Sequence, residues 1–137
     1  MNPYILLVED DEISAYLTLK ALQKCFFPAP IIRANDGKEA LDHLNSIKLK
    51  PRLLLLDIKL PKFSGIELLA AMRKIENLKS IPVIIFTASD MQEDKDITIA
   101  LGIMKYMVKP MDFQDLISQM IEVKQIFLSF DQEIITN

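Results

Sequence analysis

Short apolar runs recur along the chain and alternate with longer stretches of mixed polarity. Three of the five runs show no polar alternation, which is typical of strands covered on both faces in the middle of a parallel sheet. Their short length and the flanking Pro3, Pro51 and Pro82 favour strands over helices. The five predicted strands are Tyr4–Val8, Ile31–Ala34, Leu53–Leu56, Val83–Phe86 and the less apolar Lys105–Val108.

The stretches between these runs carry apolar residues at helical spacing. The last stretch is the clearest, since Phe113, Leu116 and Met120 recur at steps of three and four. Asp112 precedes them as a candidate N-cap, and Gly102 is the predicted end of the fourth helix. The first four helices are marked by Leu17, Ala21 and Leu22; by Ala40, Leu41, Leu44 and Ile47; by Leu68, Leu69, Met72 and Ile75; and by Ile97, Ala100, Leu101 and Met104.

Strand and helix alternate five times, which predicts a three-layer α/β domain. Its parallel sheet would be covered by helices on both faces and joined by right-handed crossovers. The length of 137 residues is that of one domain. Because the helical pattern fades after Leu128, we expect a domain over residues 1–128 and a short tail over Ser129–Asn137.

Composition narrows the functional classes. The chain is 50% hydrophobic and 26% charged, close to the globular averages of about 45–50% and 25%. A net charge of −3 gives no basic surface for nucleic acid. No run reaches the ~20 apolar residues of a membrane span, and Tyr4–Val8 is too short for a signal peptide. We therefore expect a cytoplasmic protein that binds neither nucleic acid nor membrane.

The chain has one cysteine and one histidine. These counts exclude a Cys-rich or two-His metal motif and favour a reducing compartment. We expect His43 to be a solvated helix residue without a companion ligand, and Cys25 to be a small buried hydrophobe.

Polar residues with chemical potential stand where the predicted strands end. They are Glu9-Asp10-Asp11-Glu12 after the first strand, Asp57 after the third, Thr87 after Phe86 in the fourth, and Lys109 after the fifth. Open parallel sheets bind ligands at the carboxyl ends of their strands. Two like charges about 4 Å apart repel by roughly 4 kcal/mol at an effective dielectric of 20. The crowded carboxylates therefore predict a compensating cation.

The ligand chemistry favours magnesium. Carboxylate oxygens without His or Cys prefer Mg²⁺ or Ca²⁺ to zinc. Mg²⁺ suits a site with few protein ligands that keeps waters and takes a phosphate oxygen. If Glu9, Asp10 and Asp57 meet one Mg²⁺ and the Lys109 ammonium, three negative charges face three positive ones.

Each of these residues also has an ordinary structural interpretation. Acids after a strand often cap the next helix and favour its positive dipole end, which suits Asp11 and Glu12 best. Asp57 could be a loop acid, and Thr87 a β-branched residue that finishes its strand. Lys109-Pro110 could be a simple turn. Their coincidence at four strand ends favours a functional site.

The motifs resemble those of the receiver domains of two-component response regulators, which are phosphorylated by histidine kinases. The matching segments are Glu9-Asp10, Leu54 to Pro61 with Ser64-Gly65, Phe86-Thr87-Ala88, Tyr106 and Lys109-Pro110. They stand in the family's order over essentially the whole chain. The resemblance implies a doubly wound flavodoxin-like fold with strand order 2-1-3-4-5, and a cis peptide bond before Pro110.

The resemblance also implies a role for each matching residue. Asp57 would accept a phosphoryl group from a phosphohistidine of a partner kinase, and Lys109 would contact a phosphoryl oxygen. Thr87 would bond the phosphorylated product and Tyr106 would turn inward. The Mg²⁺ ligands would be Asp10, Asp57 and the backbone carbonyl of Lys59, with Glu9 acting mainly through water. Such a protein is a signalling module that promotes only its own phosphorylation and dephosphorylation.

The chain departs from the family pattern at four positions. Lys59 and Ser89 stand where the lifetime of the phosphoryl group is tuned. Glu9 replaces the commoner Asp, and Ser64 stands where an Asp is usual. We expect Lys59 to alter hydrolysis by ion-pairing with the phosphoryl group or with Glu9.

The expected partners follow from the same resemblance. The end of the last helix, Ile126-Phe127-Leu128, is similar to that of single-domain regulators that partner phytochrome-type histidine kinases. The signal would leave by docking on a downstream protein or by passing the phosphoryl group to a phosphotransfer protein. The family docks partners, or itself, through the fourth helix, fifth strand and fifth helix, so a homodimer there is a further expectation. Met104, Met107 and Met111 flank that strand.

Other functions fit the residues less well. A phosphatase of the haloacid-dehalogenase type needs a second acid where Lys59 stands. A flavodoxin-like flavin carrier needs a Ser/Thr-rich loop where this chain has four acids, and no nucleotide-binding glycine motif occurs. The main alternative is a degenerate receiver that acts as a phosphorylation-independent interaction module. The residues that argue against it are Asp10, Asp57, Thr87 and Lys109.

Overall fold

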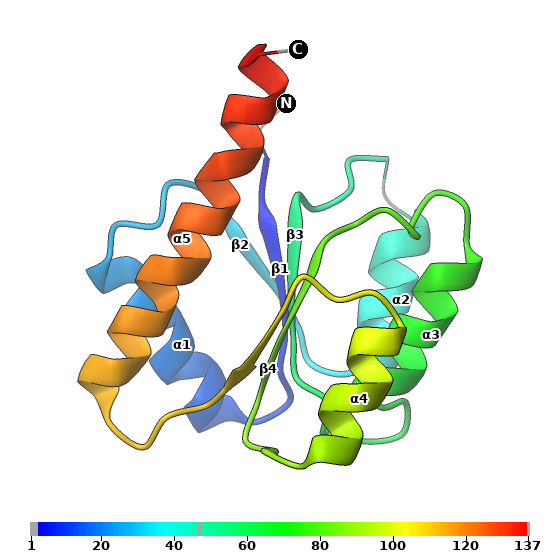
Figure 1. The fold of residues 1–137 in the computed structure, drawn as a ribbon, viewed down its shortest axis with the longest axis horizontal. Coiled ribbons are helices and arrows are strands. Elements are labelled where there is room, and N and C mark those ends of the chain that lie inside the picture. The colour runs from blue at the N-terminus through cyan, green and yellow to red at the C-terminus, as the bar shows by residue number, and fades with distance from the viewer. Residues whose placement is uncertain (1–2, 47, 137) are drawn as a thin grey trace.

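Five parallel strands form one sheet in the order β2-β1-β3-β4-β5, which confirms the predicted topology. The computed structural model describes residues 3–46 and 48–136, so Ile47 lies outside the described residues. The strands are β1 (Ile5–Val8), β2 (Ile31–Ala34), β3 (Leu53–Leu56), β4 (Val83–Thr87) and β5 (Lys105–Val108) (Figure 1). The helices are α1 (Glu12–Lys24), α2 (Gly37–Ser46), α3 (Gly65–Lys74), α4 (Gln92–Ala100) and α5 (Phe113–Thr136).

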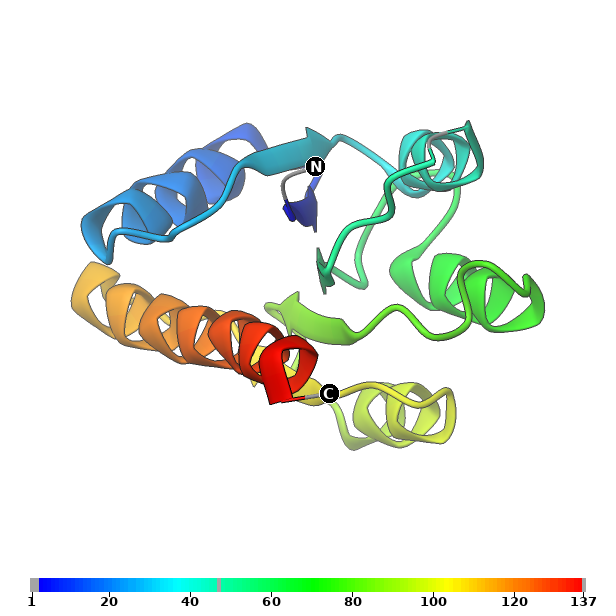
Figure 2. The same cartoon turned by 90° about the horizontal axis from the view of Figure 1, so that it is seen from above.

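Helices cover both faces of the sheet, as Figure 2 shows. α1 and α5 pack together on one face, whereas α2, α3 and α4 form a row on the other. The predicted three-layer α/β fold is therefore confirmed.

The three central strands β1, β3 and β4 are buried along their whole length. Successive side chains point to opposite faces. Ile5 and Leu7 therefore pack beneath α1 and α5, while Leu6 and Val8 join the core beneath the other helices. Burying one such side chain stabilises the fold by about 1.5–3 kcal/mol. This double core makes the middle of the sheet a firm base for the residues at its strand ends.

The last helix is longer than predicted. The tail expected after Leu128 is instead the continuation of α5 through Thr136, and this part of the prediction was wrong. No glycine or proline follows Pro110, and Phe127 and Phe130 continue the apolar face against the core. Figure 1 shows the end of α5 rising past the sheet. Neither α5 nor any other described helix has the length and apolarity needed to cross a membrane. The domain boundary at residue 128 stays a prediction.

α4 is present, but it packs differently from its predicted apolar face. Among its described residues, Thr98 alone is buried, whereas Ile97 is 38% exposed. α4 ends at Ala100, so Leu101 and Met104 lie beyond it. Gly102 follows with a φ of +83°, in agreement with its predicted role at the helix end. α4 is consequently the most weakly anchored helix in apolar terms.

α1 ends in a Schellman motif with an unusual residue in the left-handed position. The amide of Phe27 donates to the carbonyl of Leu22, and the amide of Phe26 donates to that of Gln23. Phe26 has a φ of +57° and is 83% exposed. A bulky side chain in this conformation costs roughly 1–2 kcal/mol, and little buried surface offsets that cost.

The variant Phe26→Gly should therefore be more stable than the wild type, by about 0.5–1 kcal/mol after the greater unfolded-state entropy of glycine is allowed for. Urea unfolding followed by circular dichroism measures the difference. Phe26→Ala is the matched control, because it removes the ring but keeps the strained Cβ, and it should leave stability nearly unchanged. Equal stability of the glycine and alanine variants would contradict the explanation.

Candidate functional site

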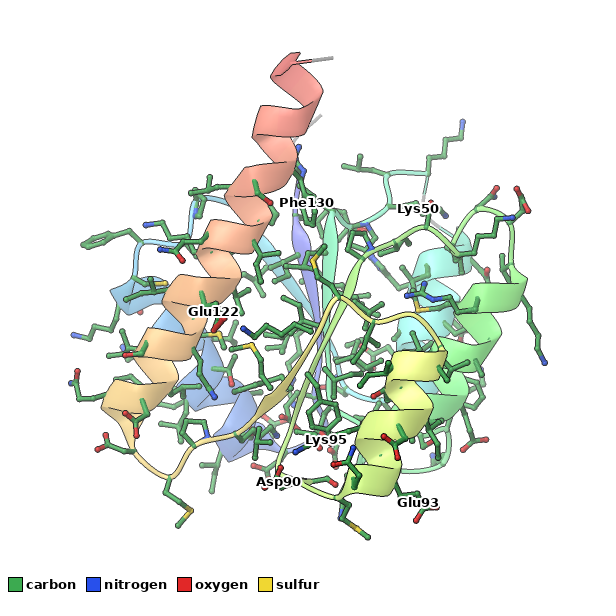
Figure 3. The ribbon with its side chains drawn as sticks, viewed as in Figure 1. Lys50, Asp90, Glu93, Lys95, Glu122 and Phe130 are labelled. Carbon is green, nitrogen blue, oxygen red and sulfur yellow. The ribbon has the colours of Figure 1, made fainter. Side chains whose placement is uncertain are left out.

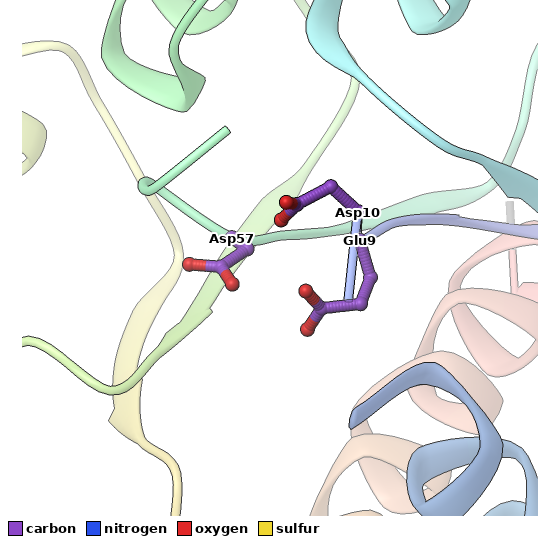
Figure 4. A group of neighbouring side chains, drawn as sticks. All are labelled: Glu9, Asp10 and Asp57. Atoms are coloured by element: carbon purple, nitrogen blue, oxygen red, sulfur yellow. The ribbon is translucent and has the colours of Figure 1, made fainter. Parts of the chain in front are cut away.

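Three carboxylates converge at the carboxyl ends of two neighbouring strands. β1 pairs with β3 so that Val8 lies beside Leu56, and the amide of Asp57 donates to the carbonyl of Val8 at 3.1 Å. This register places Asp57 next to the loop that carries Glu9 and Asp10. Figure 4 shows the three side chains pointing toward one another.

These carboxylates suit a divalent cation. One oxygen from each of Glu9, Asp10 and Asp57 lies within 4.8 Å of the others. Glu9 and Asp57 are buried, whereas Asp10 is exposed and leaves an open side for water or a ligand. The donor set is entirely hard oxygen, which fits Mg²⁺, Mn²⁺ or Ca²⁺ rather than zinc. The residues therefore fit the metal that the strand ends predict.

Lys109 bridges two of the carboxylates from the end of β5. Its ammonium donates to Asp57 Oδ2 at 2.9 Å and also to Glu9 Oε1. Burial opposes the charge of Lys109, but the hydrogen bonds to Asp57 and Glu9 outweigh it and raise the pKa of the amine. Lys109 therefore remains an ammonium and holds the two buried carboxylates together.

Glu9 is held by more than the lysine. Its Oε1 accepts a hydrogen bond from the Ser14 hydroxyl at 2.8 Å, and its Oε2 accepts from the amide of Asp11 at 3.2 Å. Burial raises the pKa of the Glu9 carboxyl, the Lys109 hydrogen bond opposes this, and the Asp57 charge adds to it. The pKa of Glu9 is therefore higher in the folded than in the unfolded protein. As the pH rises through this range and Glu9 loses its proton, the free energy of unfolding decreases.

The local charge is negative without a cation. Glu9, Asp10 and Asp57 contribute three negative charges, and the Lys109 ammonium contributes one positive charge. The remaining excess of two equals the charge of one divalent ion. A bound cation would therefore relieve both the repulsion and the desolvation of Glu9.

Thr87 and Tyr106 are joined through the loop between β4 and α4. Thr87 is fully buried, and its hydroxyl accepts a long hydrogen bond of 3.4 Å from the amide of Ser89. The Tyr106 hydroxyl donates to the carbonyl of Ser89 at 2.8 Å. The side chain of Ser89 in turn donates to Asp94 on α4. Ser89 thus connects both predicted switch residues to α4, a role that its sequence position does not reveal.

The start of α4 also contacts Tyr106 from outside. Lys95 forms an ion pair with Asp90 at 2.6 Å, and its ammonium lies 5.9 Å from the centre of the Tyr106 ring. Figure 3 shows Asp90 and Lys95 together at this end of α4. Tyr106 therefore contacts both the β4–α4 loop, through its hydroxyl, and the ammonium of Lys95, through its ring.

Some of the ordinary structural interpretations hold. Asp11 is the N-cap of α1, since its side chain accepts from the amide of Ser14 at 2.7 Å. Ser64 forms a capping box with Glu67 at the start of α3, which accounts for its presence at that position. Cys25 is buried, as predicted.

Three expectations need correction. The described chain contains no cis peptide bond, so Lys109–Pro110 is trans, the intrinsically favoured isomer. No ion pair among the described residues involves Lys59, and the oxygens of Glu9 are already occupied, so the expected Lys59–Glu9 pair is absent. His43 is half-buried rather than simply solvated, because its Nε2 lies 3.0 Å from the hydroxyl of the buried Tyr4.

The chain belongs to the response regulator receiver domain family, whose sequence profile matches residues 5–121. It is 35% identical over 136 residues to the probable methanogenesis regulatory protein FilR2 of Methanothrix harundinacea, covering 96% of this chain and 88% of that protein. It is 30% identical over 129 residues to the response regulator Rcp1 of Synechocystis, covering 90% and 88%.

Solved structures of response regulators are similar over nearly the whole chain. The phosphorylated cyanobacterial phytochrome response regulator RcpA superimposes with a TM-score of 0.86 at 29% identity and covers 95% of this chain and 96% of its own. The Mn²⁺-bound form of Rcp1 gives a TM-score of 0.83 at 30% identity, with coverages of 92% and 94%. A relative with this fold therefore binds a divalent cation, which agrees with the acidic pocket described above.

Mn²⁺ or Mg²⁺ at ten times its dissociation constant should raise the thermal midpoint of this protein by about 3–5 °C, because binding to the folded state alone adds about 1.4 kcal/mol. Differential scanning calorimetry measures the shift. Asp10→Asn should abolish most of it, whereas Asp42→Asn, at an exposed acid on α2, should retain it. An equal shift in both variants would place the ion elsewhere.

Proposed function

We propose that this protein is a phosphorylatable response regulator that accepts a phosphoryl group on Asp57 from the phosphohistidine of a sensor histidine kinase. The observation that carries the proposal is the Asp57 carboxylate itself. It is buried, it accepts a hydrogen bond from Lys109, and it lies within 4.8 Å of two further acids. This combination suits a nucleophile whose reaction is assisted mainly by positioning and electrostatics.

In the proposed reaction, a carboxylate oxygen of Asp57 forms a bond to phosphorus while the phosphorus–nitrogen bond of the phosphohistidine breaks. The electron pair of that bond remains on the imidazole of the kinase. Asp10, Asp57 and the backbone carbonyl of Lys59 would hold Mg²⁺, with Glu9 acting through water. The ion would supply neutralisation of the charge on the transferring group.

The residues around Asp57 then stabilise the product. Lys109 transfers a hydrogen bond from Asp57 to a phosphoryl oxygen, and Thr87 donates its hydroxyl to another. The movement of Thr87 weakens its contact with Ser89, and Tyr106 turns inward into the space that is released. Because Ser89 is bonded to Asp94, this local change is passed to α4.

The weak anchoring of α4 supports an output surface formed by α4, β5 and α5. Large apolar side chains of these elements are exposed: Ile99 of α4 is 62% exposed, Met104 just before β5 is 49% exposed, and Ile121 of α5 is 42% exposed. In the phosphorylated protein, this surface binds a downstream protein or a second copy of the chain. Transfer of the phosphoryl group to a phosphotransfer protein is the other route for the signal.

The proposed kinase is of the phytochrome type, since RcpA is named as a phytochrome response regulator and Rcp1 shares its fold with this chain. The proposed location is the cytoplasm, where such kinases present their phosphohistidine.

Some relatives carry the domain within longer chains: the match to PhoP of Bacillus subtilis covers 43% of that protein. The downstream step is therefore assigned from the surface of this domain and not from those proteins.

Incubation with acetyl phosphate and Mg²⁺ should add one phosphoryl group, detected by intact mass spectrometry. The adduct should be released by hydroxylamine, as expected of an acyl phosphate. Asp57→Asn should give no adduct, and Lys109→Met should slow its formation at least tenfold, because the developing charge loses its ammonium. Asp42→Asn should react like the wild type. A wild-type protein without an adduct would instead indicate the degenerate receiver.

Lys59→Ala should shorten the lifetime of the phosphorylated protein by about two- to fivefold, because an exposed ion pair with the phosphoryl group contributes roughly 0.5–1 kcal/mol. The decay of the mass adduct after removal of the phosphodonor measures the lifetime. Lys62→Ala is the matched control, since Lys62 is an exposed lysine of the same loop. Equal decay rates in wild type and Lys59→Ala would exclude a role for Lys59.

A further inference from the structure

Arg33, on the edge strand β2, contacts the loop that carries two of the three acids. Its Nε and Nη2 donate to the carbonyl of Glu9 at 3.1 and 3.0 Å, and Nη2 lies 3.4 Å from the carbonyl of Asp10. Its Nη1 forms an ion pair with Glu12 at 3.1 Å. The Arg33 side chain is 20% exposed, whereas that of Glu12 is 83% exposed. The contacts with the backbone are therefore the more sheltered ones.

The sheet explains why these contacts matter. The amide of Glu9 donates to the carbonyl of Ala34 at 3.1 Å, where β1 and β2 last lie side by side. Two nitrogens of the planar Arg33 guanidinium donate hydrogen bonds to the carbonyl of Glu9. Two consecutive residues of β2 thus hold both backbone polar groups of Glu9.

We infer that Arg33 is a positioning residue for the divalent cation: it fixes the peptide units of Glu9 and Asp10 so that their carboxylates face Asp57. This inference rests on the metal-dependent acceptor proposed above. The orientation of a metal ligand is commonly set by the groups that hold its surroundings, and losing such a group typically costs 10–100-fold in metal affinity.

The positive charge of Arg33 and its positioning role predict opposite changes in metal affinity when Arg33 is replaced, so the direction of the measured change distinguishes them. A positive charge beside the pocket repels a divalent cation. If charge alone mattered, Arg33→Met would bind metal more tightly and Arg33→Lys would bind it like the wild type. If positioning dominates, both variants bind it more weakly, because lysine keeps the charge but lacks the planar fork.

The experiment measures the Mn²⁺ dissociation constant of the full chain by electron paramagnetic resonance, with Mg²⁺ as competitor. We expect Arg33→Met and Arg33→Lys to raise the dissociation constant about tenfold. Glu12→Gln, which removes the ion pair but keeps the backbone contacts, should change it less than about twofold. Lys38→Met, at an exposed lysine on α2, should leave it unchanged.

Two further measurements separate positioning from a loss of stability. Thermal unfolding without metal reports the structural contribution of Arg33. Phosphorylation by acetyl phosphate should show a raised half-saturating Mg²⁺ concentration in both variants, but a maximal rate within about twofold of the wild type. A merely destabilising substitution would instead lower the folded fraction at every Mg²⁺ concentration. If Arg33→Met does not fold, the dissociation constant of Arg33→Lys decides.

The possible failures are distinguishable. If the wild-type protein does not bind Mn²⁺, the proposed metal-dependent function fails. If the wild type binds Mn²⁺ while the two Arg33 variants bind it equally well or more tightly, positioning by Arg33 is overturned and the proposed function stands.

Discussion

The buried contact between one ammonium and two carboxylates is the constraint on which the site depends. Lys109 can reach both Glu9 and Asp57 because the parallel register brings the ends of β1 and β3 together and β5 ends on the same edge of the sheet. Without Lys109, two acids would be buried side by side, an arrangement that strongly opposes ionisation. With it, one ammonium faces three carboxyl groups, so the pocket holds fewer basic than acidic groups. The fold therefore produces a pocket that suits a divalent cation and, under the proposed function, places the nucleophile Asp57 within it.

The same molecule combines a firm sheet with one weakly anchored helix. β1, β3 and β4 are buried throughout, whereas Thr98 is the one buried residue of the described helix α4. At its start, Ser89 bonds Asp94; beyond its end, Arg73 donates to the carbonyl of Leu101 at 2.8 Å. Polar contacts respond to a local change of charge more readily than a packed apolar core does. A phosphoryl group at Asp57 would therefore affect α4 before it disturbs the sheet.

Local patterns predicted the features that depend on local sequence. Unbroken runs such as Leu53–Leu56 indicated buried strands, and buried parallel strands bring their ends to one edge, so Asp57 could be placed beside the first loop. The length of α5 was missed because Phe130 packs against the core beyond Leu128, the point where the periodicity fades. The contacts of Arg33 and Ser89 could not be predicted, since they depend on side-chain directions across elements that are remote or irregular.

Glu9, which stands where receiver domains more commonly have Asp, changes the hydrogen bonding around the acidic pocket. The longer side chain lets its carboxylate accept hydrogen bonds from Lys109, Ser14 and the amide of Asp11 at once. Under the proposed function, Lys109 must contact the phosphoryl group in the product, and its bonds to Glu9 and Asp57 then compete with that contact. The Ser14 and Asp11 bonds would still hold Glu9 when Lys109 turns away. Glu9 is thus compatible with a movement of Lys109 toward the phosphoryl group, because the Glu9 carboxylate also accepts hydrogen bonds from Ser14 and from the amide of Asp11.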